Sequence, residues 1–147
     1  MRLTSKRLNS NKYNAVQNIN INNDIDIKKI KIILDKIDVI IAVYLFGSVA
    51  INKQNSLSDI DIAVLLKKNV NYFDYKLRIH HDIARLTKKE ADVVVLNEVH
   101  NLYLIDSIIN KGILLIDKNR EKRIDYELSL SHAILDYKAF RHAIDAK

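Results

Sequence analysis

The chain has 147 residues, 48% of them hydrophobic and 29% charged, which is the composition of one globular domain with a buried core. It has no apolar run near the roughly eighteen residues of a membrane span and no secretory signal pattern, so we expect a single cytoplasmic domain (residues 1–147) without a membrane partner. The formal charge of +6 favours a negatively charged partner, and the absence of cysteine excludes disulfides and thiolate metal sites.

The N-terminal part is predicted to be a basic segment followed by a helix. The first 23 residues contain no acidic residue and show no sustained hydrophobic period, which favours a basic arm or a weak helix. An amphipathic helix is predicted over residues 24–37, with Asn23 or Asp24 as its N-cap. Its apolar residues recur at steps of three and four positions and are Ile27, Ile30, Ile33, Leu34 and Ile37.

Three apolar runs are predicted to be strands, over residues 39–46, 59–66 and 91–96. The first run is mostly β-branched or aromatic and stops at Gly47, which predicts a strand buried on both faces. A helix is predicted between the second and third strands, over residues 72–86. The face that it turns to the core is expected to carry Phe73, Leu77, His80 or His81, and Ala84.

The C-terminal part is predicted to hold two helices and an edge strand. Residues 102–110 should form a helix that Gly112 closes in the left-handed conformation, followed by a short edge strand over residues 113–116. Strands alternating with helices predict an α/β (α+β) fold, in which helices flank a small mixed sheet.

A long helix is predicted over residues 119–144, and it carries two apolar rows. The first row is Ile124, Leu128 and Leu135, and the second is Tyr126, Leu130, Ile134, Tyr137 and Ile144. One row is expected to cover the domain's own sheet, and the other a partner protein or a second copy of the chain. The alternative is a helix that is simply buried more deeply.

Two carboxylates open the second predicted strand. Asp59 and Asp61 occupy alternate positions, so their side chains leave the same face roughly 6.6 Å apart along the chain. Carboxylates held this close beside an apolar sheet repel each other unless a cation neutralises them. Because only oxygen ligands are offered, Mg²⁺ is the first candidate and Mn²⁺ the second.

A glycine, a serine and a third acid complete the pattern. Gly47 lets the backbone turn sharply and approach a ligand, and Ser48 adds a hydroxyl that can bind a phosphate oxygen. Asp92 opens the third predicted strand as Asp59 opens the second. If these strands are neighbours, Asp92 can accept a proton from an attacking hydroxyl or hold a second metal ion. Such a set describes in-line displacement at a phosphoryl centre.

These residues resemble the signature of the DNA polymerase β-type nucleotidyltransferases, in their minimal MNT branch. The resemblance rests on Gly47 and Ser48, a ten-residue gap, and Asp59-Ile60-Asp61 between apolar strands. It extends through "ADVVVLN" and "IINKGILLI", and within the branch it is to MntA-like antitoxins, which pair with HEPN-domain HepT toxins. It implies a nucleotidyltransferase fold with a long C-terminal helix.

The resemblance also implies roles for individual residues. Asp59, Asp61 and Asp92 would be the catalytic, metal-binding triad, most simply with two Mg²⁺ ions, while Gly47 and Ser48 would hold the triphosphate of ATP. Family members commonly have a basic residue and then a glycine where this chain has isoleucine and asparagine, at positions 51 and 52. The missing cation puts one phosphate contact in doubt, which Lys53 would replace.

The resemblance implies a Mg²⁺-dependent adenylyltransferase that moves AMP from ATP onto a tyrosine of a HEPN ribonuclease toxin and thereby silences it. One alternative is a non-catalytic antitoxin that binds the toxin directly through the C-terminal helix. Another is transfer of a nucleotide to a small molecule of the aminoglycoside type. Nucleic acid is less favoured as a partner, because no stacking aromatics interleave with the basic residues.

Overall fold

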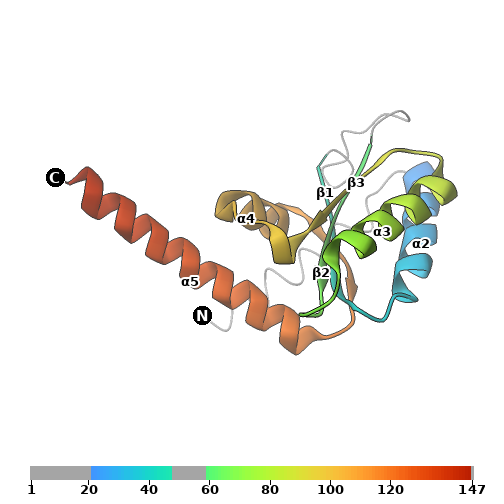
Figure 1. Ribbon diagram of the computed structural model, residues 1–147. Coiled ribbons are helices and arrows are strands. Elements are labelled where there is room, and N and C mark those ends of the chain that lie inside the picture. The colour runs from blue at the N-terminus through green and yellow to red at the C-terminus, as the bar shows by residue number, and fades with distance from the viewer. Residues whose placement is uncertain (1–20, 48–58, 147) are drawn as a thin grey trace.

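The computed structural model describes residues 21–47 and 59–146. Figure 1 shows a sheet with helices on both sides and a long helix at the C-terminus. The elements in chain order are α2 (Ile21–Asp35), β1 (Ile40–Phe46), β2 (Ile60–Leu66), α3 (Tyr72–Thr87), β3 (Ala91–Val95), the 3₁₀ helix η2 (Leu96–Glu98), α4 (Leu102–Lys111), β4 (Ile113–Asp117) and α5 (Arg120–Asp145). The predicted N-terminal segment of 23 residues lies outside this description up to residue 20.

The sheet is mixed, as predicted, and its four strands lie in the order β3-β2-β1-β4. The central strand β1 is antiparallel to β2 and to β4, whereas β2 and β3 are parallel. The prediction that the third strand lies beside the second is therefore confirmed, and β4 is the predicted edge strand. The mixed sheet flanked by helices confirms the predicted fold class.

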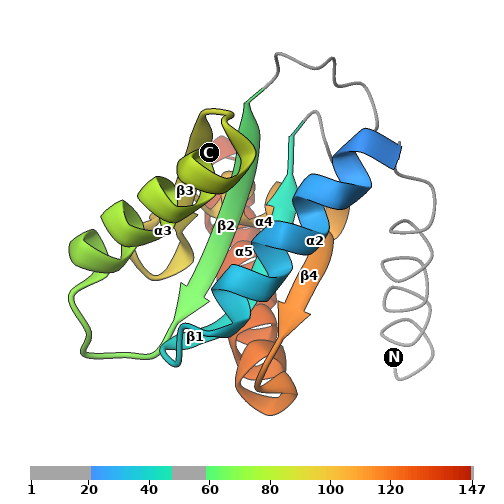
Figure 2. The ribbon, with the colours of Figure 1, turned by 90° about the vertical axis from the view of Figure 1, so that its right-hand side faces the viewer.

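Helices cover both faces of the sheet. Figure 2 shows α2 and α3 across one face, with α4 and α5 behind the other. Side chains that alternate along β2 separate accordingly: Ile62 and Val64 join the core under α2 and α3, and Ala63 and Leu65 join the core under α4 and α5. Because both faces are covered, β1 is buried along nearly its whole length, as its uninterrupted apolar run predicted.

The N-cap predicted for α2 and the core face predicted for α3 are wrong. Helix α2 begins at Ile21, so Asn23 and Asp24 lie inside it and neither is its N-cap. Helix α3 turns Ile79 and Ile83 to the core, with Tyr72 and Tyr75 packed beside them. The predicted core residues of α3 face outward instead, as shown by Phe73 and Leu77, which are 62% and 52% exposed. The predicted face would have buried a histidine, which costs free energy unless its ring is hydrogen-bonded, whereas the observed face buries two isoleucines.

Gly112 follows α4 for a different reason from the one predicted. Its φ of −75° and ψ of 169° are extended, so the predicted left-handed cap is wrong. A Cβ at this position would collide with the carbonyl oxygen of Ile108 and lie 3.0 Å from that of Leu45. The backbone N–H of Gly112 donates to the same Ile108 oxygen at 2.8 Å. Glycine is required here because β4 leaves α4 in close contact with two backbone carbonyls.

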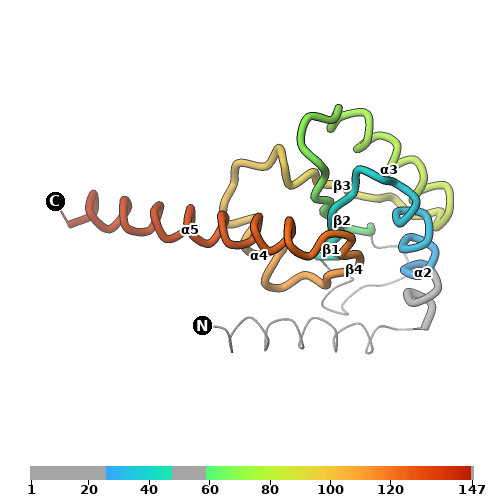
Figure 3. The backbone as a smooth tube through the Cα atoms, turned by 90° about the horizontal axis from the view of Figure 1, so that it is seen from below, coloured from blue at the N-terminus to red at the C-terminus, as the bar shows by residue number. Residues whose placement is uncertain are grey.

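Helix α5 packs on the sheet with its first half and projects beyond it with its second (Figure 3). Asn119 caps it, because its side chain accepts a hydrogen bond from the Lys122 backbone N–H at 3.1 Å. In the predicted second row, Leu130 and Ile134 are buried on the domain's own core, as expected for one row. Every described residue after Ile134 is exposed, because the sheet ends there. None of the helices in the described ranges is long and apolar enough to cross a membrane.

Candidate active site

The strand register brings the acidic residues to one end of the sheet. Phe46 pairs with Asp61 across β1 and β2, and Asp61 pairs with Asp92 across β2 and β3. Asp59 lies just before β2, and Gly47 follows Phe46 at the end of β1. Strands that arrive from separate parts of the sequence thus place three carboxylates and the glycine along one edge, which we call the acidic edge (Asp59, Asp61 and Asp92).

The side chains of the acidic edge lie on the α4 and α5 side of the sheet. Asp61 shares its face with Ala63 and Leu65, and Asp92 shares its face with Val94, which packs against the same core. Asp59 and Asp92 are exposed, whereas Asp61 is partly buried. Of the three carboxylates, that of Asp61 is therefore the least exposed to solvent.

Like charges crowd Asp61. Burial raises the pKa of its carboxyl, and the negative charges of Asp92 and Asp59 raise it further. None of the causes lowers it, because no cationic side chain faces this group among the described residues. A positively charged ligand at the acidic edge would remove the repulsion.

The backbone of Gly47 lies directly against the side chain of Asp61. Its φ of +73° lies in the left-handed region, which glycine adopts without strain. A Cβ at this position would also collide with the Asp61 carboxylate oxygen Oδ2. The backbone at the end of β1 therefore passes directly against the acidic edge, whereas the approach of Gly47 to a ligand stays a prediction.

The other predicted phosphate-binding residues, Ser48 and Lys53, lie outside the described residues, as do positions 51 and 52. Their roles stay predictions. The described part of the loop is Gly47 alone, and it adjoins the acids as predicted.

The donor set of the acidic edge fits a hard divalent cation. It offers only carboxylate oxygens, from three side chains whose mutual repulsion a dication would offset. In the described ranges, no group of three or more His, Cys, Asp or Glu side chains is already arranged to hold a metal ion. The acids thus share an edge and the right chemistry without forming a closed ligand cage.

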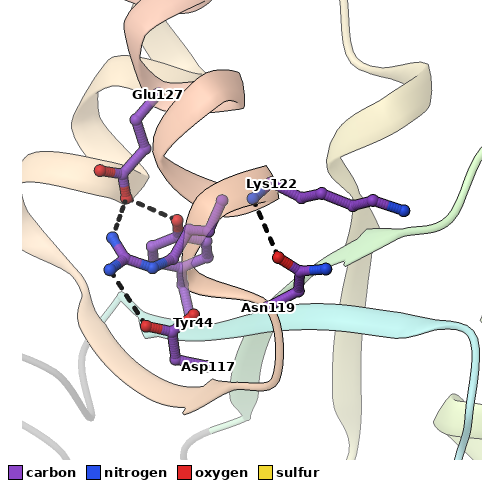
Figure 4. A network of polar contacts seen from close by, with 6 residues as sticks. Tyr44, Asp117, Asn119, Lys122 and Glu127 are labelled. Atoms are coloured by element: carbon purple, nitrogen blue, oxygen red, sulfur yellow. Dashed lines mark hydrogen bonds and ion pairs between the residues drawn. The ribbon is translucent and has the colours of Figure 1, made fainter.

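A second charged cluster, which the sequence reasoning missed, lies where β4 joins α5 (Figure 4). Arg123 is 1% exposed, and its guanidinium contacts Asp117 at 3.0 Å and Glu127 at 3.2 Å. The Tyr44 hydroxyl donates to the same Glu127 oxygen at 2.7 Å. We call these four residues the buried ion network. The one local feature of the sequence that could have indicated this network is an arginine four residues before a glutamate on a predicted helix.

The chain is similar to known nucleotidyltransferases. A family model described as "Polymerase beta, Nucleotidyltransferase" matches residues 28–121. A protein of Methanocaldococcus jannaschii, named as a candidate protein adenylyltransferase, is 36% identical over 69 residues, which cover 47% of this chain and 72% of that protein.

Solved structures share the fold. One chain in a crystal structure of a toxin–antitoxin complex with AMP-PNP is 25% identical with a TM-score of 0.64, and the likeness covers 85% of this chain and 95% of that one. A complex of a tri-AMPylated HEPN toxin from Shewanella oneidensis with its MNT antitoxin contains a chain that is 23% identical, with a TM-score of 0.62 and coverage of 82% and 93%. The family model covers more than half of the chain and agrees with the mixed sheet and the acidic edge. The chain therefore belongs to the polymerase beta nucleotidyltransferase family.

Proposed function

We propose that this protein is an antitoxin that acts as an adenylyltransferase: it transfers AMP from ATP to a tyrosine hydroxyl of a cognate HEPN-family ribonuclease toxin. The observation that carries the proposal is the register of Asp61 with Asp92, because it assembles three carboxylates beside Gly47 at one edge of a nucleotidyltransferase sheet. The names of the relatives, which include a protein adenylyltransferase and toxin–antitoxin complexes, support the choice of substrate and partner.

In the proposed reaction the tyrosine oxygen attacks the α-phosphate of ATP. A new O–P bond forms, the bond between the α- and β-phosphates breaks, and pyrophosphate leaves. Asp92 accepts the proton of the tyrosine hydroxyl, since it lies at the exposed edge beside Asp61. Asp59, Asp61 and Asp92 are the proposed ligands of magnesium, which when bound supplies positive charge against the phosphate oxygens.

The phosphates are proposed to lie along the end of β1. Gly47 leaves room beside Asp61 for a phosphate to approach the backbone, and Ser48 and Lys53 are the proposed hydroxyl and ammonium contacts of the triphosphate. The absence of a side chain at Gly47 keeps Asp61 in place while the phosphate binds.

The projecting half of α5 is the proposed contact surface for the toxin. Its exposed apolar side chains include Leu135, Phe140 and Ile144, which are 64%, 60% and 49% exposed. The sheet of this chain does not reach them, so a partner protein would remove this apolar area from water.

The proposal is tested by co-expressing the chain with the product of the neighbouring reading frame, which the proposal expects to be a HEPN protein, and weighing that product by mass spectrometry. The wild-type chain should add the mass of AMP to the partner, and the double variant Asp59→Asn, Asp61→Asn should add none while its circular dichroism stays unchanged. The matched control is Asp35→Asn with Asp74→Asn, two exposed acids outside the acidic edge, which should transfer AMP as the wild type does. Undiminished transfer by the first double variant would refute the mechanism.

The same variants separate catalysis from simple binding. If the double variant still neutralises the toxin without nucleotide, the rival function, a non-catalytic antitoxin acting through α5, is favoured. The exposed apolar side chains on α5 are the observation that supports this rival.

A further inference from the structure

A pocket of about 690 Å³ lies between the sheet and the first turns of α5. Its apolar wall is formed by Ile41 of β1 and Leu65 of β2, both nearly fully buried. Tyr126 of α5 closes it from the other side, and lysines lie around it. This volume lies within the range of pockets that hold small molecules.

The pocket is separate from the acidic edge. Asp61 and Leu65 share one face of β2, but Asp61 lies near the beginning of the strand and the pocket at its end. From Asp61 to Leu66 a strand advances roughly 16 Å. On β1, which runs antiparallel, Ile41 lines the pocket and Gly47 adjoins the acids at the opposite end. A ligand here would not touch the proposed catalytic residues.

The charge of the pocket favours an anion. Lys67, Lys68 and Lys122 line it, and Asp125 is its one acidic lining residue. None of these lysines has a carboxylate partner within residues 21–47 and 59–146. Three lysines against a single carboxylate at an apolar wall give a net positive charge, which favours the binding of phosphate oxygens.

The pocket is also built in advance of a ligand. The Asn97 side chain accepts from the Leu66 backbone N–H at 2.9 Å and donates to the Leu66 carbonyl at 2.8 Å, which holds the rim. Burial raises the pKa of Tyr126 to about 12, so its hydroxyl remains a hydrogen-bond donor. In the described part of the chain this hydroxyl has no hydrogen-bond partner, although it lines the pocket.

We infer that this pocket is a second ligand site, which binds a small phosphorylated molecule with a flat ring, the chemistry of a nucleoside monophosphate. The lysines receive the phosphate, and Ile41, Leu65 and the Tyr126 ring receive the flat apolar face. Asn97 and Asp125 supply the polar groups that orient such a ring.

The test uses AMP as the probe and the full chain carrying Asp59→Asn and Asp61→Asn, in EDTA, so that the acidic edge and magnesium contribute nothing. Isothermal titration calorimetry at low salt should show one AMP per chain. Adding Lys122→Glu should weaken binding at least about tenfold, the effect of one charge-assisted phosphate contact. Lys138→Glu, on an exposed lysine of the same helix beyond the pocket, should leave the affinity within about twofold.

Two further probes identify which part of AMP is recognised. Inorganic phosphate alone and adenosine alone should each bind at least about tenfold more weakly than AMP, because each lacks one half of the recognised chemistry. The inference is overturned if AMP shows no binding up to about 10 mM, if Lys122→Glu and Lys138→Glu have equal effects, or if phosphate binds as well as AMP does. None of these outcomes depends on whether the chain transfers AMP.

Discussion

Two clusters of charged side chains contact the sheet, and they differ in whether the chain itself supplies the opposite charge. In the buried ion network, Arg123 lies between Asp117 and Glu127, so the chain supplies both signs of charge. In the acidic edge, Asp61 faces Asp92 and Asp59, and the described residues supply no cation. The first cluster pairs charges of both signs within the fold, although Asp117 Oδ1 and Arg123 Nε have no hydrogen-bond partner among the described residues, whereas the second is proposed to be completed by a positive ligand.

This difference separates structural charge from functional charge. A buried arginine with two carboxylate partners ties the start of α5 to β4 and to Tyr44 on β1, and it serves the fold. The three carboxylates of the acidic edge have no counterion among the described residues, so their repulsion lowers stability. Such a cluster is typical of a site that binds a ligand. The predicted consequences are opposite: removing charge from the network should weaken the fold, and removing it from the acidic edge should weaken only function.

The largest effect on stability is expected for Arg123→Ala. The substitution removes the guanidinium that contacts Asp117 and Glu127 beside the core, which should lower the free energy of unfolding by about 3–5 kcal/mol. Urea denaturation followed by circular dichroism measures it. Arg141→Ala, at an exposed position of the same helix, is the matched control and should change stability by no more than about 0.5 kcal/mol. A similar small change in both variants would show that the network does not anchor α5.

Substitutions at two glycines are expected to have effects of intermediate size on stability. Gly112→Ala drives a Cβ into the Ile108 carbonyl, which cannot move without the backbone, and should cost about 2–3 kcal/mol. Gly47→Ala strains a backbone with φ of +73° and displaces the Asp61 carboxylate, which should cost about 1 kcal/mol. AMP transfer should nevertheless fall further in Gly47→Ala, once both variants are assayed below their unfolding temperatures. An equal loss of AMP transfer in the two folded variants would show that Gly47 has no specific role in the active site.

The smallest effect concerns pH. The pKa of Asp61 is raised in the folded state, so Asp61 contributes to folding stability at low pH. This contribution is lost as the pH rises above the ordinary range of aspartate pKa values. Asp61→Asn has no such group, so without divalent ions its stability relative to the wild type should increase between about pH 4 and pH 7. Thermal melts of both proteins measure the difference. A constant difference, or one that reverses, would mean that Asp61 is not crowded by its neighbours.

The sequence predicted the elements better than it predicted their faces. The apolar runs of β1 and β2 and the acids before and within β2 have strong local patterns, so the strands and the candidate edge were predicted in position. Helix α3 has two rows that fit a helical period, and only packing decides between Phe73 and Ile79. The pattern alone could not assign the buried face.

Contacts between distant segments were beyond local reasoning. Arg123 reaches Asp117 only because the turn after β4 folds α5 back across the sheet. Its other partner, Glu127, accepts a hydrogen bond from Tyr44, which lies on a strand far earlier in the chain (Figure 4). The pocket beside Tyr126 depends on the same path. Likewise, glycine is required at position 112 because one carbonyl of β1 and one of α4 leave no room for a side chain. No motif around the glycine reveals these contacts.

The proposal for the acidic edge is that a cation from solution completes it. It is tested most directly by the rise in melting temperature that MgCl₂ adds in the presence of a non-hydrolysable ATP analogue, over the same analogue in EDTA. This increment excludes any magnesium-independent binding in the pocket beside Tyr126. The wild type should gain several degrees, and Asp59→Asn with Asp61→Asn should gain none. An equal gain in both proteins would contradict binding of the cation at the acidic edge.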